Sequence, residues 1–301
     1  MDLKQLDYFV HVAELGSFTR AATVLRVAQP ALSRQVRALE VELRQPLFDR
    51  NGRGVTLTEA GKRLLAHGRG ILQQVDRARQ DLEDQRGAAS GRLAIGLPPS
   101  VGRTLTGPLV EAFRARFPKA TLTVVEGLST YTLEWLTLGR VDCAVVYNVT
   151  PAAAFDLVPV LDEPLFLVSA RGAAPEPVGK PVTLARLAEH ELVMPSRPHS
   201  IRMLLETALA AASLQARVDL EIESVPAILD LVERNPMHAV LALNALRGRE
   251  AAFVARPILL AKEGPFLATK LWIATSAQRP RGPLVEQGSA LLVEMLNRLL
   301  I

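Results

Sequence analysis

Apolar residues at helical spacing mark the segment 30–43. Leu32, Val36, Leu39 and Leu43 follow one another at intervals of four, three and four residues, which places them on one stripe of an α-helix. Pro30 suits the first turn of this helix, where its missing N–H would be unpaired anyway. A shorter amphipathic segment with Ser17 as its N-cap precedes it. We therefore expect two helices joined by a tight turn.

The polar positions of the second helix carry chemistry suited to DNA. At about 100° per residue, Ser33, Arg34 and Arg37 project away from the apolar stripe. Gln29 stands at the helix start, beside Pro30. Gln can form two hydrogen bonds to adenine, Ser can donate or accept, and Arg can bind guanine or phosphate. This pattern is typical of a recognition helix that enters the major groove.

A hairpin is predicted immediately after these helices. Residues 47–57 form two short strand-like runs around Asn51-Gly52, a strong signal for a tight β-turn. The hairpin would act as a wing carrying Arg50 and Arg53. Positions 20–63 hold nine Lys or Arg and four acidic residues, a surplus of five compared with a net charge of +4 for all 301 residues. A basic helix alone is usually just a solvated surface, but this concentration of charge favours contact with phosphates.

The segment from Leu6 to Gly61 resembles the winged helix-turn-helix of LysR-type transcriptional regulators. That resemblance implies double-stranded DNA as the partner, read at a pseudo-palindromic promoter site, with RNA polymerase as a further partner. It implies recognition contacts by Gln29, Pro30, Ser33 and Arg34, and entry of Arg53 into the minor groove. Stretches 27–30 and 96–100 look closest to the nitrogen-assimilation control subgroup. The residues that carry the resemblance are Phe9, Gly16-Ser17-Phe18, Ala21-Ala22, Gln29-Pro30-Ala31-Leu32-Ser33, Leu39-Glu40, Leu43, Leu47-Phe48-Asp49-Arg50 and Leu57-Thr58-Glu59-Ala60-Gly61.

A long helix is expected after the wing, with Thr58 as its N-cap. The alternative to dimerisation is that this helix packs on its own domain, but the glycines Gly61 and Gly68 favour close approach of a partner backbone, because glycine is costly in an exposed helix. We predict a dimer or a dimer of dimers, with two recognition helices facing successive major grooves. The seam repeats at heptad spacing through Leu57, Gly61, Leu64, Gly68, Ile71, Val75, Ala78 and Leu82.

From Arg92 onward, short apolar runs alternate with helical patterns, which indicates an α/β domain with a largely parallel sheet. By resemblance to the family, this is a two-lobed, periplasmic-binding-protein-like domain. We expect a winged helix-turn-helix over 1–58, a linker helix over 59–90 and a regulatory domain over 91–301. The lobes would comprise 91–162 with 267–301, and 163–266. Strands are predicted at 92–97, 121–126, 142–146, 164–169, 191–194, 217–222, 238–243 and 269–275, and helices at 105–117, 200–212, 225–234 and 283–300.

A ligand site is expected beyond the C-terminal ends of the strands, where helix N-termini present free N–H groups. Hydroxyl groups there also cap helices, which is the alternative role of each Ser or Thr. Two arginines in 196–202 favour a small anionic effector. The segment 234–244 lacks the Gly-rich turn that many family members have, which could reshape this wall of the cleft. The candidate effector residues are Ser100, Ser129, Thr130, Tyr147, Arg197, Ser200 and Arg202.

Other classes of protein are disfavoured. The chain contains no P-loop, no GxSxG and no HExxH or CxxC spacing, so we expect neither an enzyme nor a metal or other cofactor. The single cysteine, Cys143, lies in an apolar run and is expected to be a buried, inert thiol. No apolar run approaches the roughly 20 residues of a membrane span, and the start does not resemble a signal peptide, so we expect a cytoplasmic protein. A winged-helix sensor of another type and a regulator without effector control remain as alternatives.

Overall fold

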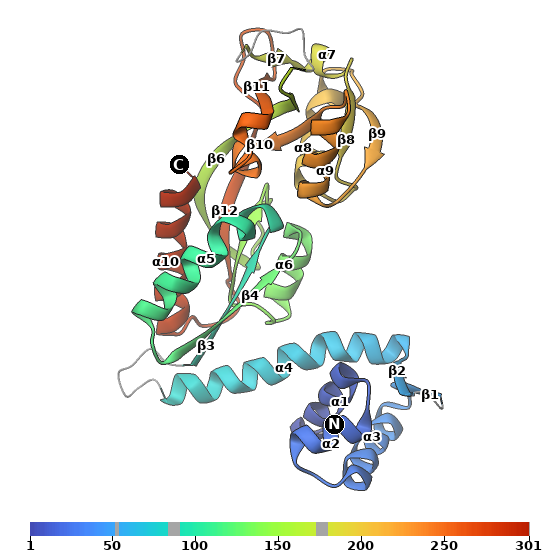
Figure 1. The fold of residues 1–301 in the computed structure, drawn as a ribbon. Helices are drawn as coiled ribbons and strands as arrows, with labels where there is room; N and C mark the ends of the chain where they lie inside the picture. Colours follow the sequence, from blue (N-terminus) through green and yellow to red (C-terminus); the bar gives the residue numbers. More distant parts are fainter. Residues whose placement is uncertain (52–53, 84–90, 173–179, 301) are drawn as a thin grey trace. The chain divides into compact units, whose positions relative to one another are not determined.

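The structure is a computed structural model that describes residues 1–51, 54–83, 91–172 and 180–300 (Figure 1). The chain forms two compact units, which are described separately. The first comprises Met1–Gly91 with Thr137–Arg140, and the second comprises Arg92–Leu136 with Val141–Ile301. No described helix is long and apolar enough to cross a membrane.

Three helices open the first unit, and the second and third are the two that the sequence predicted, joined by a tight turn. Ser17 caps the second helix, because its hydroxyl accepts the backbone N–H of Arg20 at 3.3 Å. Gly16, with φ of 60°, ends the first helix in a left-handed conformation that suits glycine. Arg26, with φ of 55°, ends the second, leaving a three-residue turn before the third. The helices are α1 (Leu3–Leu15), α2 (Phe18–Leu25) and α3 (Gln29–Leu43).

The apolar stripe of α3 forms much of this unit's core. Leu32, Val36 and Leu39 are completely buried, whereas Leu43 remains 37% exposed at the end of the helix. Phe9 of α1 and Phe18 of α2 both contact the ring of Phe48, with centroids 5.3 and 5.7 Å apart. These contacts attach the hairpin to the helices, since Phe48 is its first residue. The hairpin consists of β1 (Phe48–Asn51) and β2 (Gly54–Leu57), paired antiparallel as predicted.

The long helix α4 (Glu59–Glu83) follows the hairpin. Thr58 caps it by accepting the N–H of Gly61 at 3.0 Å. A Cβ on Gly61 would overlap the carbonyl oxygen of Leu47, and one on Gly68 would stand 3.1 Å from the side chains of Leu6 and Val10. Both glycines therefore allow close packing of α4 against its own domain. The inference that they allow close approach of a partner's backbone is wrong. The first half of α4 packs on the helix-turn-helix, which is the alternative stated from the sequence.

A mixed sheet forms the centre of the second unit, with strand order β4-β3-β5-β12-β6-β11-β7 and β10 paired to β6. The β3·β5 pair is parallel, but β12 runs antiparallel to β5 and to β6, as do β10 and β11 to β6. The sheet is thus less parallel than predicted. Its strands are β3 (Gly91–Leu97), β4 (Ala120–Glu126), β5 (Cys143–Tyr147), β6 (Phe155–Ala170), β7 (Val182–Thr183), β10 (Ala239–Ala242), β11 (Phe253–Leu259) and β12 (Ala268–Ser276).

Two lobes are visible in this unit, and β6 runs from one into the other (Figure 1). Its first half pairs with β12 and its second half pairs with β10 and β11. The return connection enters β12 at Leu267, whose carbonyl accepts the N–H of Leu165 at 2.8 Å. These positions match the crossings predicted near 162–164 and 264–267. A separate parallel pair, β8 (Glu191–Met194) and β9 (Arg217–Glu221), belongs to the second lobe.

Helices flank the sheets, and apolar side chains are buried between the helices and the strands.

Cys143 is completely buried in β5, as expected from its apolar surroundings. The first half of β6 and all of β11 were not predicted, because their residues are only partly buried or alternate and each contains a proline, Pro159 or Pro257. The helices are α5 (Pro99–Arg116), α6 (Ser129–Thr137), α7 (Leu184–Leu187), α8 (Ser200–Ala211), α9 (Val225–Arg234) and α10 (Pro283–Leu300), with two 3₁₀ turns at Leu243–Leu246 and Glu250–Ala252.

Candidate functional sites

The outward face of α3 presents the residues selected from the sequence. Gln29, Pro30, Arg34 and Arg37 are exposed, and Ser33 is half-buried. Arg34 and Arg37 form no ion pair with any residue in the part of the chain that the structure describes. An exposed guanidinium without an internal partner is free to bind phosphate or a base edge.

Burial on the opposite face fixes the rotation of α3 about its own axis. With Leu32, Val36 and Leu39 completely buried, the helix cannot turn its polar face inward. Glu40 adds a link to the hairpin, because its carboxylate accepts the backbone N–H groups of Leu47 at 2.9 Å and Phe48 at 3.2 Å. The wing is thereby held next to the recognition helix.

The two arginines predicted for the wing cannot be placed. Arg50 belongs to β1, but its side chain is not described, and Arg53 lies outside the described residues. Leu82, the last residue of the predicted seam, likewise has no described side chain.

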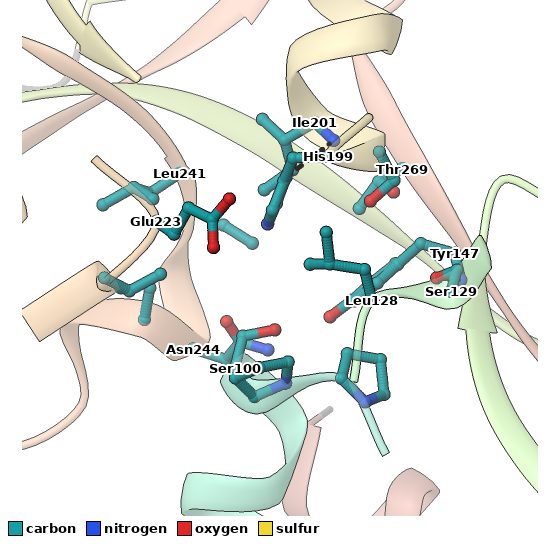
Figure 2. A pocket seen from close by; sticks show the side chains of 16 residues that line it. Ser100, Leu128, Ser129, Tyr147, His199, Ile201, Glu223, Leu241, Asn244 and Thr269 are labelled. Atoms are coloured by element: carbon teal, nitrogen blue, oxygen red, sulfur yellow. Dashed lines mark hydrogen bonds between the residues drawn. The ribbon is translucent and has the colours of Figure 1, made fainter. Parts of the chain in front are cut away.

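A pocket of about 50 Å³ lies in the second unit, where strand ends and helix starts from both lobes meet. Ser100 at the start of α5, Ser129 at the start of α6 and Ser200 at the start of α8 all line it. Figure 2 shows His199, Glu223 and Tyr147 extending toward the same space, with Ser100 and Asn244 across from them. The full lining is Pro98, Pro99, Ser100, Leu128, Ser129, Tyr147, His199, Ser200, Ile201, Glu223, Val225, Leu241, Ala242, Asn244, Ala245 and Thr269.

Tyr147 joins the pocket to a buried carboxyl group. Its backbone N–H donates to the Ser129 hydroxyl at 2.9 Å, which positions the end of β5. Its own hydroxyl donates to Glu163 at 3.4 Å. Burial, reinforced by the charge of Glu163, raises the pKa of Tyr147. Burial likewise raises the pKa of Glu163 to about 7, so this carboxyl can change charge near neutral pH.

The second lobe contributes polar groups that the sequence did not single out. Nδ1 of His199 accepts the N–H of Ile201 at 3.3 Å, and burial lowers the pKa of this imidazole, which is therefore uncharged at neutral pH. Glu223 accepts the Ser196 hydroxyl at 2.9 Å and keeps its remaining carboxylate capacity. Both amide atoms of Asn244 are buried without an aligned hydrogen-bond partner in the described part of the chain.

Of the seven residues expected to bind an effector, Ser100, Ser129, Tyr147 and Ser200 line the pocket, whereas Thr130, Arg197 and Arg202 do not. The two guanidinium groups share the carboxylate of Glu206, at 2.8 Å from Arg197 and 2.5 Å from Arg202. Arg202 is also 3.4 Å from Glu221. Their charge is neutralised within the lobe itself.

Among the additional lining residues, only Asn244 gave a signal in the sequence. It ends the segment 234–244, in which the expected glycine-rich turn is replaced. His199 and Glu223 lie next to helix starts, where polar residues usually serve as caps. Nothing in the local pattern distinguishes a cap from a pocket residue, because that distinction depends on the other lobe.

Comparisons with known families agree with this arrangement of parts. Residues 3–62 match the family described as bacterial regulatory helix-turn-helix protein, lysR family. Residues 86–297 match the LysR substrate binding domain. The full-length CbnR structure in complex with its target DNA has a TM-score of 0.72 at 24% sequence identity, covering 98% of this chain and all of that one. The structure of a full-length OxyR variant from Pseudomonas aeruginosa has a TM-score of 0.71 at 22% identity, covering 98% of this chain and 94% of its own.

Individual relatives of known function indicate the subgroup of the family to which this chain is most similar. The nitrogen assimilation regulatory protein nac of Escherichia coli is 37% identical over 248 residues, which cover 82% of this chain and 80% of that protein. Its counterpart from Klebsiella aerogenes is 33% identical over 99% of this chain and 96% of its own length. The predicted likeness to the nitrogen-assimilation control subgroup is supported, and these relatives are regulators rather than enzymes. Family matches over both parts of the chain, together with full-length relatives, place this protein in the LysR family of DNA-binding transcriptional regulators, with an effector-binding domain after its helix-turn-helix.

Proposed function

We propose that this LysR-family regulator reads promoter DNA through the outward face of α3 and the wing, and that a small ligand in the pocket controls its output. The observation that carries the DNA part is the pair of exposed arginines, Arg34 and Arg37, which have no ion-pair partner among the described residues. They extend from the side of α3 opposite its completely buried stripe. CbnR, a structural neighbour, is described in complex with its target DNA, which supports the same use of this fold.

The contacts divide by chemistry. Gln29, Ser33 and Arg34 are proposed to read base edges in the major groove, and Pro30 to fix the helix start against the DNA. Arg37 and Arg50 are proposed to bind phosphates, and Arg53 to enter the minor groove beside the wing.

Self-association is proposed to involve the second half of α4. Ile71 is 38% exposed, whereas Leu72 packs on the core of the helix-turn-helix. An exposed Ile on a long helix suits a helix partner, and Val75 and Ala78 continue the same seam. Pairing would present two recognition helices to a pseudo-palindromic site, as a dimer or a dimer of dimers. RNA polymerase is a proposed partner of the DNA-bound assembly.

Sedimentation of an Ile71→Asp, Val75→Asp variant tests this interface. Two carboxylates in an apolar seam would be buried without partners, so the variant should sediment as a smaller species. Ile71→Leu, Val75→Leu is the matched apolar control and should keep the parent size. An unchanged size for the Asp variant would remove α4 from the interface.

The effector proposal rests on the pocket itself. The sequence-based expectation of an anion depended on Arg197 and Arg202, whose charges are held by Glu206 and Glu221. Support for a negative ligand is thus reduced to the hydroxyl groups and free N–H groups at the starts of α5 and α6. The alternative is a regulator without effector control, in which the pocket stays filled with water.

DNA binding provides the decisive test of function. A site would be selected from genomic fragments bound by the full chain, and affinity measured by fluorescence anisotropy. Changing Gln29, Ser33 and Arg34 together to Ala should cost at least a hundredfold in affinity for that site and abolish preference over scrambled DNA. Arg186→Ala, an exposed arginine paired with Glu189 on α7, is the matched control and should bind normally. Full specificity in the triple variant would disprove the proposed reading face.

A further inference from the structure

The pocket combines the Glu223 carboxylate with the buried amide of Asn244. Among the described residues that line it there is no Lys or Arg, and His199 is uncharged at neutral pH. Glu223 lines the pocket directly, and Glu163 stands behind it, hydrogen-bonded to the Tyr147 hydroxyl. A ligand entering this space therefore meets hydroxyl and amide groups and the carboxylate of Glu223 (Figure 2).

Asn244 provides the independent sign that a ligand belongs there. Its amide oxygen and nitrogen are both buried. The amide interacts with the nearby Tyr147 hydroxyl, but neither of its polar atoms forms a well-aligned hydrogen bond within the described part of the chain. A buried amide without hydrogen bonds is unfavourable, and native structures usually satisfy such groups with a ligand or water. Asn244 lines the pocket beside Ser100, so a small molecule with both a donor and an acceptor would complete it.

The size of the space limits the occupant. The pocket holds about 50 Å³, and one water needs roughly 10 to 15 Å³ on the same measure. Three or four heavy atoms fit without movement of the lobes. A larger molecule would have its polar head here and the remainder outside.

We propose that the effector group bound in this pocket is an N–H donor, either an uncharged amide or a cationic amine or amidine, and not a carboxylate. The N–H groups donate to Glu223, and the Asn244 amide pairs with the ligand's donor and acceptor. A carboxylate in the same position would face the Glu223 carboxylate, and no Lys or Arg among the described lining residues would balance the two charges. This inference rests on the proposed function of the pocket as the effector site.

Three isosteric probes separate the charge classes: acetamidinium, acetamide and acetate. They have the same heavy-atom shape and differ in carrying one positive, no, or one negative charge. Each would be added as a salt or neutral solute to the full-length protein at matched ionic strength, and binding measured from the melting temperature and by ligand-observed NMR. A ligand that binds only the folded state must raise the melting temperature.

We expect acetamidinium and acetamide to bind and acetate not to bind at pH 7.5. Glu223→Gln should weaken acetamidinium at least fivefold and change acetamide less than twofold. Asn244→Leu should weaken both nitrogen ligands. Glu286→Gln, an exposed acid on α10, is the matched control and should leave all three unchanged.

The outcomes test two statements separately: that the pocket is the effector site, and that its ligand is an N–H donor. Binding of acetate alone, lost in Ser100→Ala, would keep the pocket as the effector site and overturn the ligand class. If none of the three probes bound, both the ligand class and the effector role of the pocket would be overturned. The proposal that α3 binds DNA would be unaffected, because the affinity measurements on DNA test it separately. Equal loss of acetamide and acetamidinium in Glu223→Gln would overturn the role assigned to this carboxylate.

Discussion

Two pairs of arginines in this protein, one on α3 and one at or just before the start of α8, are used in opposite ways. On α3, Arg34 and Arg37 are exposed and form no ion pair within the described residues. At the start of α8, Arg197 and Arg202 converge on one carboxylate, Glu206, and the Arg202 side chain is only 8% exposed. The first pair can bind an external anion and the second already has an internal one.

The difference arises from the surrounding acids and not from the arginines. Glu206 lies four residues after Arg202 and faces it on the same side of α8, and Glu221 approaches from β9. Four residues after Arg34 stands Ala38, which offers no charge. Glu40 follows Arg37 by three residues, but its carboxylate accepts the N–H groups of Leu47 and Phe48. A basic residue on a helix is therefore available to a ligand only where the acids of the next turn and of neighbouring elements are missing or have other partners.

The largest expected effect concerns the unpaired arginines. Arg34→Ala with Arg37→Ala should reduce DNA affinity at least a hundredfold at physiological salt. Because Arg37 is the one of the two proposed to bind phosphate, the dependence of affinity on salt should fall by about one phosphate contact. Anisotropy titrations over a range of salt concentrations measure both. Arg197→Ala is the matched control from α8 and should leave affinity and slope unchanged. Equal losses of DNA affinity in the two variants would show that the arginines of α3 are no more important for DNA binding than Arg197.

Breaking the internal pair should destabilise the second unit. Glu206→Gln leaves the buried Arg202 with only the more distant Glu221, and we expect a loss of about 2 to 3 kcal/mol in the free energy of unfolding. Glu189→Gln removes an exposed partner of Arg186 and should cost less than about 0.5 kcal/mol. Urea denaturation of both variants provides the measurement. A neutral result for Glu206→Gln would mean that the α8 arginines are not held by this carboxylate.

The buried acid of the pocket should make stability depend on pH. Because burial raises the pKa of Glu163 from 4.5 to about 7, the folded state favours the protonated carboxyl. Its contribution is present at pH 4.5 and is lost as the pH rises through 7, so Glu163→Gln should gain about 2 kcal/mol over wild type at pH 8 and little at pH 4.5.

The readout for Glu163 is the difference between the two pH profiles from urea denaturation. His199 and Glu223 line the same pocket and are present in both proteins, so their contributions largely cancel in that difference. Tyr147, the hydroxyl that faces Glu163, stays protonated across this range because its pKa is raised. Parallel profiles would show that Glu163 has the same pKa in the folded and unfolded states and would overturn the effect of burial.

The smallest effect is expected from a variant that gives α3 the arginine-to-glutamate spacing of α8, which tests the comparison directly. Ala38→Glu places a carboxylate four residues after the exposed Arg34, as Glu206 follows Arg202. Pairing with Arg34, and repulsion from phosphate, should reduce DNA affinity about tenfold. Ala38→Gln has nearly the same shape without the charge and should reduce affinity less than threefold. Similar losses in both variants would attribute the effect to shape.

The DNA-reading half could be predicted closely from the sequence. The stripe Leu32, Val36 and Leu39 and the N-cap Ser17 are local signals, and each is found in its expected role. The hairpin predicted from Asn51-Gly52 has its two strands paired as expected, while Gly52 itself lies outside the described residues. The pocket could be predicted only in outline. Ser100, Ser129, Tyr147 and Ser200 were placed by the rule that ligands lie at strand ends, and all four line it.

What failed depended on residues distant in sequence. Gly61 was assigned to a partner's backbone, yet it meets Leu47 of its own domain. The direction of the central strands was misjudged because β6 pairs with β10, β11 and β12, which lie 70 or more residues further along the chain.

The sequence by itself determined the helix-turn-helix, its exposed basic face and the family, because periodicity, caps and turns act within a few residues. Only the tertiary structure decided which charges remain available. Glu221 reaches Arg202 from the strand β9. Glu223 and Asn244 of the second lobe are brought to one pocket with Tyr147, whose hydroxyl donates to Glu163 of the crossing strand β6. Charge neutralisation and burial depend on distances in space, so no local pattern distinguishes a free arginine from a paired one.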